Sequence, residues 1–224
     1  MSSELAPRLQ HTNVRPEATR ADIERLLAEC LEHGFDGAMV NPIWVPLAVD
    51  VLRGSSVQVC TALDFPMGGG TTASVAAAAL EVRSLGAEQI DVMTRPGWLR
   101  SGMEADYRDH VAAVVAAADG APVKAMLEAG LLSDGEVERA VELCVDAGVA
   151  WIKNSSGFGG GDATPELVAR LHALAAGRVR VKASGGIRTA EAARALIDAG
   201  AELLGSSASV AIATGAGTAE PGAY

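Results

Sequence analysis

The chain has 224 residues, of which 49% are hydrophobic, and it carries a formal net charge of -10 at pH 7. The hydrophobic fraction excludes a wholly disordered chain, and the length suits one large α/β domain better than two small ones. The acidic balance, with no basic stripe to offset it, argues against a nucleic-acid-binding protein.

Cysteine usage and the chain's apolar runs bear on location. Cys30, Cys60 and Cys144 lack the spacing of a zinc site, and we interpret them as free thiols in a reducing compartment. The first residues lack the basic-then-apolar pattern of a secretion signal, and no apolar run approaches the roughly 20 residues that cross a bilayer. We therefore expect a soluble, cytoplasmic protein that does not bind membranes.

Short apolar segments alternate with amphipathic helical patterns along the chain. Strands are predicted at residues 9–12, 37–41, 57–63, 89–93, 123–127, 151–153, 178–183 and 202–205. Four of them follow a helix that ends in glycine, which readily takes the left-handed conformation that closes a helix: Gly34, Gly86, Gly148 and Gly200. Helix starts are predicted at Thr19, Ser133, Thr164 and Thr189.

Eight strand–helix units without a linker favour an α/β fold, a single (β/α)8 TIM barrel. We expect residues 1–224 to form one domain, with 214–224 as a flexible, glycine-rich C-terminal tail. The alternative is an open doubly wound sheet. Since no GxGxxG motif follows the first strand, a dinucleotide-binding version of that sheet is disfavoured.

Lys153 and Lys182 each end a predicted strand and lead directly into a glycine- and serine-containing loop. A lysine held among apolar residues and beside a second cation loses stabilisation of its ammonium form, so its amine becomes a nucleophile. Glycine-containing turns expose backbone N–H groups that suit phosphate. Together these features indicate Schiff-base chemistry on a phosphorylated carbonyl compound.

Polar residues gather at the predicted strand ends, where barrels of this kind carry their active sites. They are Asn41, Asp64, Asp91, Glu128, Lys153, Lys182 and the 205–207 stretch. Strand alternation turns Asp91, Lys153 and Lys182 toward the barrel axis. Burying three charged groups costs free energy of desolvation, and a protein is expected to keep them only for a function. We therefore interpret these three residues as catalytic.

Other chemistry-bearing residues are weaker candidates. His11 lies near the end of the first strand and is a possible site residue, with a packing role as the alternative. Cys60, Trp98 and Trp151 are interpreted as packing residues. No cluster has metal-ligand spacing, so neither a metal nor a cofactor is predicted.

Several motifs together resemble the deoxyribose-phosphate aldolases. They are His11-Thr12, Arg15-Pro16, Val40-Asn41-Pro42, Val59-Cys60-Thr61, Phe65-Pro66, Ile90-Asp91, Val123-Lys124, Lys153-x-Ser155-x-Gly157-Phe158 and the run from Lys182 to Thr189. The resemblance runs in order from about Leu9 to Ala213. It implies a metal-independent class I aldolase with a TIM-barrel fold. Members reversibly cleave 2-deoxy-D-ribose 5-phosphate into acetaldehyde and D-glyceraldehyde 3-phosphate.

The resemblance also implies roles for particular residues. Lys153 would be the Schiff-base lysine, Lys182 the neighbouring cation that favours its neutral amine, and Asp91 a proton relay working with a bound water. Phosphate would be held by Gly157, Gly185, Gly186, Arg188, Gly205, Ser206 and Ser207, the last three at the start of a short helix. Further candidates are Gln10, Arg95, Lys124 and Tyr224.

Five residues around the pocket mouth depart from the family pattern: Gln10, Asn13, Asp64, Arg95 and Ala208. Gln10 stands where the family has an aspartate, and Arg95 adds a positive charge, so the pocket could favour a more anionic carbonyl compound than acetaldehyde. The alternative is that Asp64 and Arg95 pair and leave the pocket's field unchanged.

Three functions therefore stay open. The leading one is cleavage of deoxyribose 5-phosphate; the second is the same lysine imine acting on a more anionic substrate of a biosynthetic pathway. The third is a catalytically silent barrel that binds a sugar phosphate. Tyr224 could assist proton transfer, as in some members of the family, or belong to a disordered tail. The expected partner is a small phosphorylated aldehyde or sugar, with a homodimer as the expected assembly.

Overall fold

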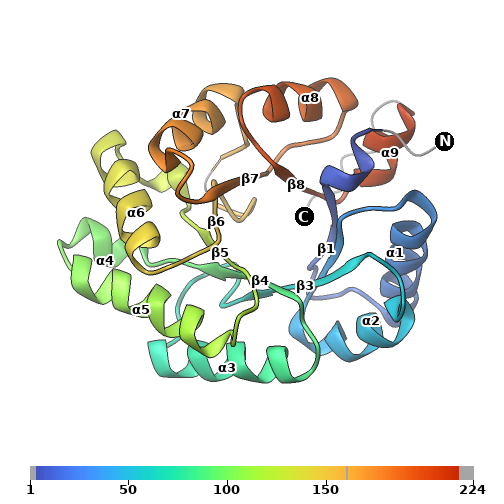
Figure 1. Cartoon of the computed structure of the whole chain (residues 1–224), viewed down its shortest axis with the longest axis horizontal. Helices are drawn as coiled ribbons and strands as arrows, with labels where there is room; N and C mark the ends of the chain where they lie inside the picture. The colour runs from blue at the N-terminus through green and yellow to red at the C-terminus, as the bar shows by residue number, and fades with distance from the viewer. Residues whose placement is uncertain (1–3, 160, 217–224) are drawn as a thin grey trace.

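The computed structural model describes residues 4–159 and 161–216. Within these residues eight parallel strands close into a barrel in chain order, with β1 paired to β8 (Figure 1). The strands are β1 (Leu9–Asn13), β2 (Gly37–Val40), β3 (Gln58–Leu63), β4 (Gln89–Met93), β5 (Val123–Met126), β6 (Trp151–Lys153), β7 (Arg180–Ser184) and β8 (Leu203–Ser206). The closed barrel confirms the predicted (β/α)8 fold and excludes the open doubly wound sheet.

The α-helices form a ring around this barrel (Figure 1). In the described residues they are α1 (Arg20–His33), α2 (Val45–Leu52), α3 (Thr72–Ser84), α4 (Pro96–Arg100), α5 (Glu104–Ala117), α6 (Asp134–Asp146), α7 (Pro165–Ala175), α8 (Ala190–Asp198) and α9 (Ser209–Thr214). Short 3-10 turns are η1 (Ala6–Arg8), η2 (Pro42–Trp44) and η3 (Ala129–Leu131). None of the helices in this part of the chain is long and apolar enough to cross a bilayer.

Local signals explain where the helices begin and end. Thr19, Ser133, Thr164 and Thr189 are N-caps whose side chains accept a backbone N–H, as predicted. For Thr19 and Ser133 the capping box is complete, because Asp22 and Glu136 return a hydrogen bond to the cap. Gly34 closes α1 with φ 67°, a conformation that a side chain disfavours.

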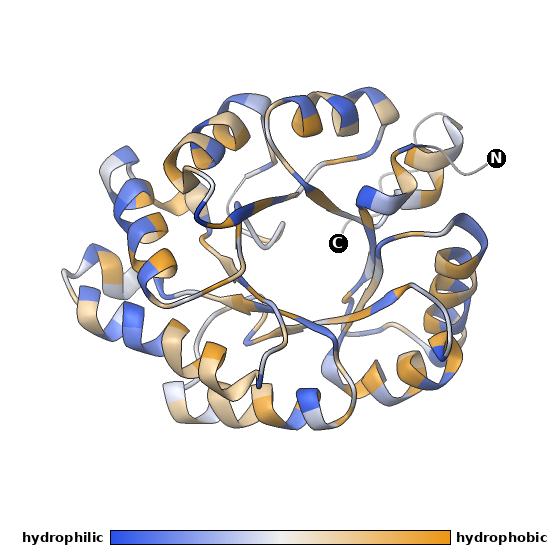
Figure 2. Cartoon of the chain, viewed as in Figure 1, coloured by the Kyte–Doolittle hydropathy of each residue, from blue (hydrophilic) through white to orange (hydrophobic). Residues whose placement is uncertain are grey.

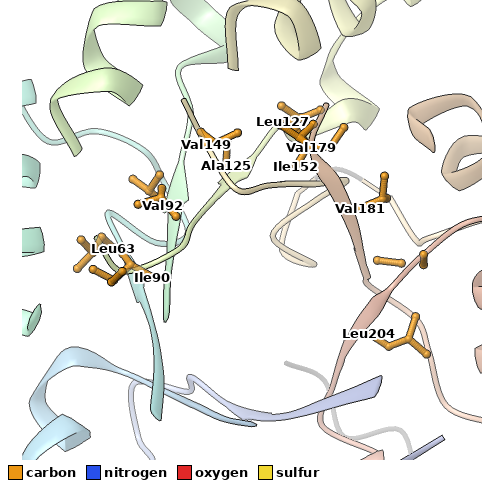
Figure 3. Close-up of a cluster of buried hydrophobic side chains, with 14 of the residues drawn as sticks. Leu63, Ile90, Val92, Ala125, Leu127, Val149, Ile152, Val179, Val181 and Leu204 are labelled. Carbon is orange, nitrogen blue, oxygen red and sulfur yellow. The ribbon is translucent and has the colours of Figure 1, made fainter. Parts of the chain in front are cut away.

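The main hydrophobic core lies between the strands and the helices. Outward-facing strand residues such as Ile90, Ile152, Val181 and Leu204 are fully or almost fully buried there (Figure 3). The helices carry both hydrophobic and hydrophilic residues along their length (Figure 2), which is typical of helices with one face on a core. Because alternate strand residues are committed to this outer core, the residues between them must face the barrel axis.

A smaller apolar cluster fills one side of the barrel interior. It consists of Val14, Met39, Cys60, Ala62, Met93 and Met126, with Phe65 packed against it.

The predicted strand boundaries differ most from the observed ones at β7, which begins at Arg180 rather than at residue 178. Arg178 belongs to the preceding turn, since its N–H donates to Ala175 O and its guanidinium pairs with Glu142.

The C-terminal prediction is only partly within reach of the structure. Helix α9 ends at Thr214, where the predicted tail begins. Residues 217–224, including Tyr224, lie outside the described residues.

Candidate active site

Asp91 lies at the centre of the barrel. It occupies β4 between Ile90 and Val92, whose side chains belong to the outer core (Figure 3). Because side chains alternate along a strand, Asp91 faces the axis. Its side chain is 0% exposed. A carboxylate so deeply buried requires compensating charges or hydrogen bonds.

Three lysines supply that compensation, one from each of the next three strands. The register places Lys124 opposite Asp91 and Lys153 opposite Lys182. The Nζ atoms of Lys153 and Lys182 donate to Asp91 Oδ2 at 3.1 and 2.8 Å. Lys124 Nζ meets Oδ1 at 3.1 Å as an ion pair rather than as an aligned hydrogen bond. The sequence contains only these three lysines, so every lysine of the protein contacts one carboxylate.

The charges around Asp91 determine its protonation. Burial would by itself raise the pKa of this carboxyl, but the charges of Lys182, Lys124 and Lys153 outweigh burial and lower the pKa far below its usual range. Asp91 is therefore an anion at every pH at which the protein is expected to work. It can accept hydrogen bonds from two amines at once.

Lys182 is the lysine whose own proton affinity is most clearly changed. Burial lowers its pKa from 10.5 to about 7; Asp91 opposes this shift, and the charges of Lys153 and Lys124 add to it. A substantial fraction of Lys182 is consequently neutral near pH 7. The site thus contains an amine able to accept a proton beside an anion that orients it.

Access distinguishes the three amines. The side chain of Lys153 is 7% exposed, against 1% for Lys182 and 0% for Lys124. Lys153 also ends β6 and contacts Met126 Sδ at 3.4 Å. It is the lysine that an incoming carbonyl compound reaches most readily. Sequence reasoning held Lys124 only as a further candidate, although the presence of just three lysines was a signal for it.

Asn154 and Ser184 are site residues that sequence reasoning missed. Asn154 Nδ2 donates to Ser184 O at 2.9 Å, and Ser184 N donates to Asn154 Oδ1 at 2.8 Å. Both residues are completely buried. This reciprocal pair ties the residue after Lys153 to the end of β7, so it fixes the strand ends that carry the two lysines. Polar residues inside two buried strand ends were the available signal.

The predicted phosphate positions lie beside the lysine cluster. Six of the seven predicted positions line a small cavity of about 30 Å³, here called the phosphate cradle: Gly185, Gly186, Arg188, Gly205, Ser206 and Ser207. Ile187 also lines it. Gly185 and Gly186 have φ 101° and 71°, values that glycine tolerates best. Arg188 is exposed. Gly157, also at positive φ, is not among the described residues that line this cavity.

Two details of this cradle differ from expectation. Ser206 is the last residue of β8 and α9 begins only at Ser209, so the predicted placement of 205–207 at a helix start is wrong. The Ser206 hydroxyl donates to Ile187 O at 2.7 Å and accepts from Ala208 N at 2.9 Å, so it stabilises the turn. In addition, the Asp162 carboxylate packs over Gly186, where any side chain would collide with it.

Some of the family departures line a larger cavity next to the cradle. This cavity of about 380 Å³ is bordered by Asn13 and Ala208, and it shares Arg188 and Ser207 with the cradle. His11 also borders it, but His11 Nε2 lies 2.7 Å from Glu29 Oε2 on α1. The histidine therefore faces the helix layer and does not reach the lysine cluster.

Arg95 does not stand as an unpaired cation at the pocket mouth. Its Nη1 lies 2.6 Å from Asp64 Oδ2, and its Nη2 donates to Gly70 O at 2.7 Å. Of the two alternatives weighed from the sequence, the structure has the local ion pair.

Cys60 lies in the inner apolar cluster, and burial raises the pKa of its thiol to about 12, so it is not a nucleophile near neutral pH.

A closed parallel barrel with amines gathered on one carboxylate at its axis defines a TIM-barrel enzyme equipped for amine chemistry on carbonyl compounds. No protein-family model matches the chain. It is 46% identical to the deoxyribose-phosphate aldolase of Thermosynechococcus vestitus, over 92% of this chain and 94% of that relative. It is 40% identical to that of Brevibacillus brevis, over 96% of this chain and 97% of the relative.

A solved structure agrees with these relatives. The tetrameric deoxyribose phosphate aldolase from Aeropyrum pernix superposes with a TM-score of 0.87 at 30% identity, covering 94% of this chain and 89% of that one. The chain belongs to the deoxyribose-phosphate aldolase family.

Proposed function

We propose that this protein is a class I aldolase that reversibly cleaves 2-deoxy-D-ribose 5-phosphate into acetaldehyde and D-glyceraldehyde 3-phosphate. The observation that carries the proposal is the shared hydrogen bonding of Lys153 and Lys182 to Asp91 Oδ2, in a chain whose relatives at 39–46% identity are named deoxyribose-phosphate aldolase. Imine formation needs a neutral amine within reach of groups that donate and accept protons.

Lys153 is the proposed nucleophile. Its amine adds to the C1 aldehyde of the open-chain sugar phosphate, and loss of water from the carbinolamine gives an imine. Removal of the C3 hydroxyl proton breaks the C2–C3 bond, which releases glyceraldehyde 3-phosphate and leaves an enamine. Protonation of C2 and addition of water then return the amine and acetaldehyde. The access of Lys153 supports this role.

Asp91 and Lys182 are the proposed proton-handling pair. Asp91 holds both amines from one oxygen, at 3.1 and 2.8 Å, and so keeps Lys182 close to Lys153 as the acceptor of a proton released there. A Lys182 pKa of about 7 allows that amine to take a proton and to return it near neutral pH. The ionised Asp91 stabilises either amine when it is charged.

The phosphate would rest on the 30 Å³ cradle formed by Gly185, Gly186 and Ser207, with Arg188 at its edge. Backbone N–H groups at glycine turns suit a phosphate, and an exposed guanidinium adds attraction. The alternative of a more anionic carbonyl substrate is not favoured, because Asp64 neutralises Arg95. A silent sugar-phosphate binder is not favoured either, since the amine cluster is complete.

We also propose an assembly and a cellular location for the protein. We expect a homodimer; the Aeropyrum pernix relative is described as tetrameric, so light scattering should separate a dimer from a tetramer. A cytoplasmic location is supported by three buried, unpaired cysteines, and cell fractionation tests it.

The test of the function is direct. Purified protein is given deoxyribose 5-phosphate, and acetaldehyde release is followed with and without EDTA. Borohydride is then added, and mass spectrometry locates the reduced adduct. Turnover in the range of roughly 1–1000 per second, with the adduct on Lys153, supports the proposal. Absence of cleavage together with absence of any lysine adduct would refute it.

A further inference from the structure

Gln10 contacts Lys182 from the N-terminal side of the barrel. It lies in β1 and is completely buried. Its Oε1 accepts a hydrogen bond from Lys182 Nζ at 2.6 Å. Lys182 therefore has two acceptors among the described residues, Gln10 Oε1 and Asp91 Oδ2. A neutral amine has two N–H groups, so this arrangement satisfies the neutral form and leaves the third proton of an ammonium without a partner.

The orientation of the Gln10 amide is fixed from below. Its Nε2 donates to Asp36 Oδ2 at 2.8 Å and to Gln89 Oε1 at 2.9 Å, which uses both of its N–H groups. The carbonyl oxygen must then point at Lys182. Asp36 precedes β2 and Gln89 begins β4, so both lie at the N-terminal end of the barrel. They border a cavity of about 250 Å³ there, remote from the phosphate cradle.

The series of hydrogen bonds from Asp36 through Gln10 to Lys182 explains why an amide suits position 10. Asp36 supplies the negative charge that Gln10 lacks, one side chain further from Lys182. A carboxylate at position 10 would lie within about 3 Å of the Asp36 carboxylate, an arrangement in which the two cannot both ionise readily. The amide passes a hydrogen bond from Asp36 to Lys182 but carries no charge.

Among the described residues, the titratable groups that act on Lys182 are Asp91 on β4, Lys124 on β5, Lys153 on β6 and the Cys60 thiol on β3. From β8 it faces Gly205, where a Cβ would lie only 3.2 Å from Lys182 Cε. With one carboxylate against three lysines, the charge state of Lys182 is sensitive to any further negative charge.

We propose that Gln10 is a positioning residue, held by Asp36 and Gln89, which presents a neutral acceptor to Lys182 and so keeps this amine available as a proton acceptor. The inference rests on the proposed function, because it concerns how the same site works. It predicts that charge, rather than shape, at position 10 sets the pH range of the enzyme. It also predicts that Asp36 influences catalysis from the far end of the barrel without contacting substrate.

The decisive variant exchanges the two groups. Gln10→Glu with Asp36→Asn keeps the number of charges but moves the carboxylate onto Lys182. The hydrogen bond between positions 10 and 36 is kept with donor and acceptor exchanged, and the Gln89 amide can turn so that its Nε2 donates to Glu at position 10. We expect the pKa of Lys182 to rise by about 1–3 units, because an opposite charge in contact favours the charged form. The apparent pKa of the acid limb of the kcat/KM pH profile should increase by the same number of units. The exchange avoids the carboxylate pair that Gln10→Glu alone would create, so it should fold.

The Lys182 titration is read by NMR in protein labelled at the lysine Cε. The sequence contains three lysines, so three signals are expected, and Lys182→Met assigns one of them. Gln10→Met, which removes the acceptor and adds no charge, should leave the midpoint at or below that of the wild type. Gln58→Glu is the matched control: it adds a carboxylate at the start of β3, beside Asp36, and should not move the midpoint.

The outcomes separate the inference from the function. A Lys182 midpoint in the exchange variant that equals that of the wild type within the error of the titration overturns the positioning role. An upward shift of similar size in Gln58→Glu would overturn it too, since the effect would then be a general field. If the wild type forms no adduct with deoxyribose 5-phosphate, the proposed function fails, while the titration still reports on Gln10 and Lys182.

Discussion

Arg95 and Asp64 form an almost completely buried ion pair just beyond the ends of neighbouring strands β4 and β3. Their Nη1 and Oδ2 atoms are 2.6 Å apart, and the side chains are 6% and 12% exposed. Asp64 Oδ1 also accepts from Gly70 N at 2.9 Å, and Arg95 Nη2 donates to Gly70 O at 2.7 Å. The pair therefore holds the loop after β3 in place, and Asp64 neutralises the charge of Arg95.

Arg95→Asn combined with Asp64→Asn should leave substrate preference unchanged. The ratio of imine-trapping rates for acetaldehyde and a keto acid is expected to stay within about twofold of the wild type, because the double variant removes a neutral pair and so leaves the net charge of the pocket mouth as it was. The stability of the single variant Arg95→Asn should fall by roughly 3 kcal/mol, since the mostly buried Asp64 carboxylate then has no cation beside it. Chemical denaturation measures the loss. The double variant Arg95→Asn with Asp64→Asn should recover part of it, and a large change in preference would restore the anionic-substrate alternative.

Lys153→Met should abolish the borohydride-trapped adduct and lower turnover by roughly 1000-fold or more, because the nucleophile is gone. Lys182→Met should still form an adduct, slowly and with a raised pH optimum, because a nearby cation and proton acceptor have been removed. Mass spectrometry of the trapped peptide checks both. Trapping on Lys182 in the wild type would show that the two lysines have been assigned the wrong way round.

The buried Asp91 should make folding sensitive to acid. Its native pKa lies below the unfolded value of about 3.9, so its contribution to stability is complete above that pH and is lost as pH falls further. The free energy of unfolding of the wild type should therefore decline below about pH 4. Asp91→Asn should be less stable at neutral pH and show a shallower acid slope. Equal slopes for the two proteins would contradict this account.

Lys182 should also make stability rise with pH, but in the alkaline range rather than in acid. Its native pKa is about 7, whereas an unfolded lysine titrates near 10.4. Between these values the unfolded chain binds more protons, so this group makes stability rise with pH, by up to roughly 5 kcal/mol. The measurement is the difference in unfolding free energy between wild type and Lys182→Met at pH 7 and pH 10. A difference that does not change with pH would argue against a lowered pKa in the native state.

Asp162→Asn should improve binding of phosphorylated substrates. The Asp162 carboxylate packs over Gly186 in the phosphate cradle, where it repels an anion. Because Asp162 is exposed, the effect should be modest: KM for deoxyribose 5-phosphate is expected to fall about two- to fivefold. KM for unphosphorylated deoxyribose serves as the control and should not change. An equal fall for both sugars would place the effect elsewhere than at the phosphate.

Local patterns in the sequence were sufficient for the barrel, its caps and the inward direction of Asp91. Thr19 and Ser133 indicate helix starts because each is followed, three residues later, by the acidic partner of a capping box. The apolar neighbours Ile90 and Val92 indicate by simple alternation that Asp91 faces inward. These signals act within one turn of helix or one stretch of strand, so they can be read without knowing the fold.

The contacts across the barrel were decided only by the tertiary structure. Lys124 meets Asp91 because β4 and β5 pair in that register, and Gln10 meets Asp36 and Gln89 across 26 and 79 residues of chain. Asp64 and Arg95 lie between the two cases: the sequence allowed both a pair and a free cation. Closure of the sheet sets which inward side chains share a layer, and that choice depends on all eight strands together, whereas alternation depends on one.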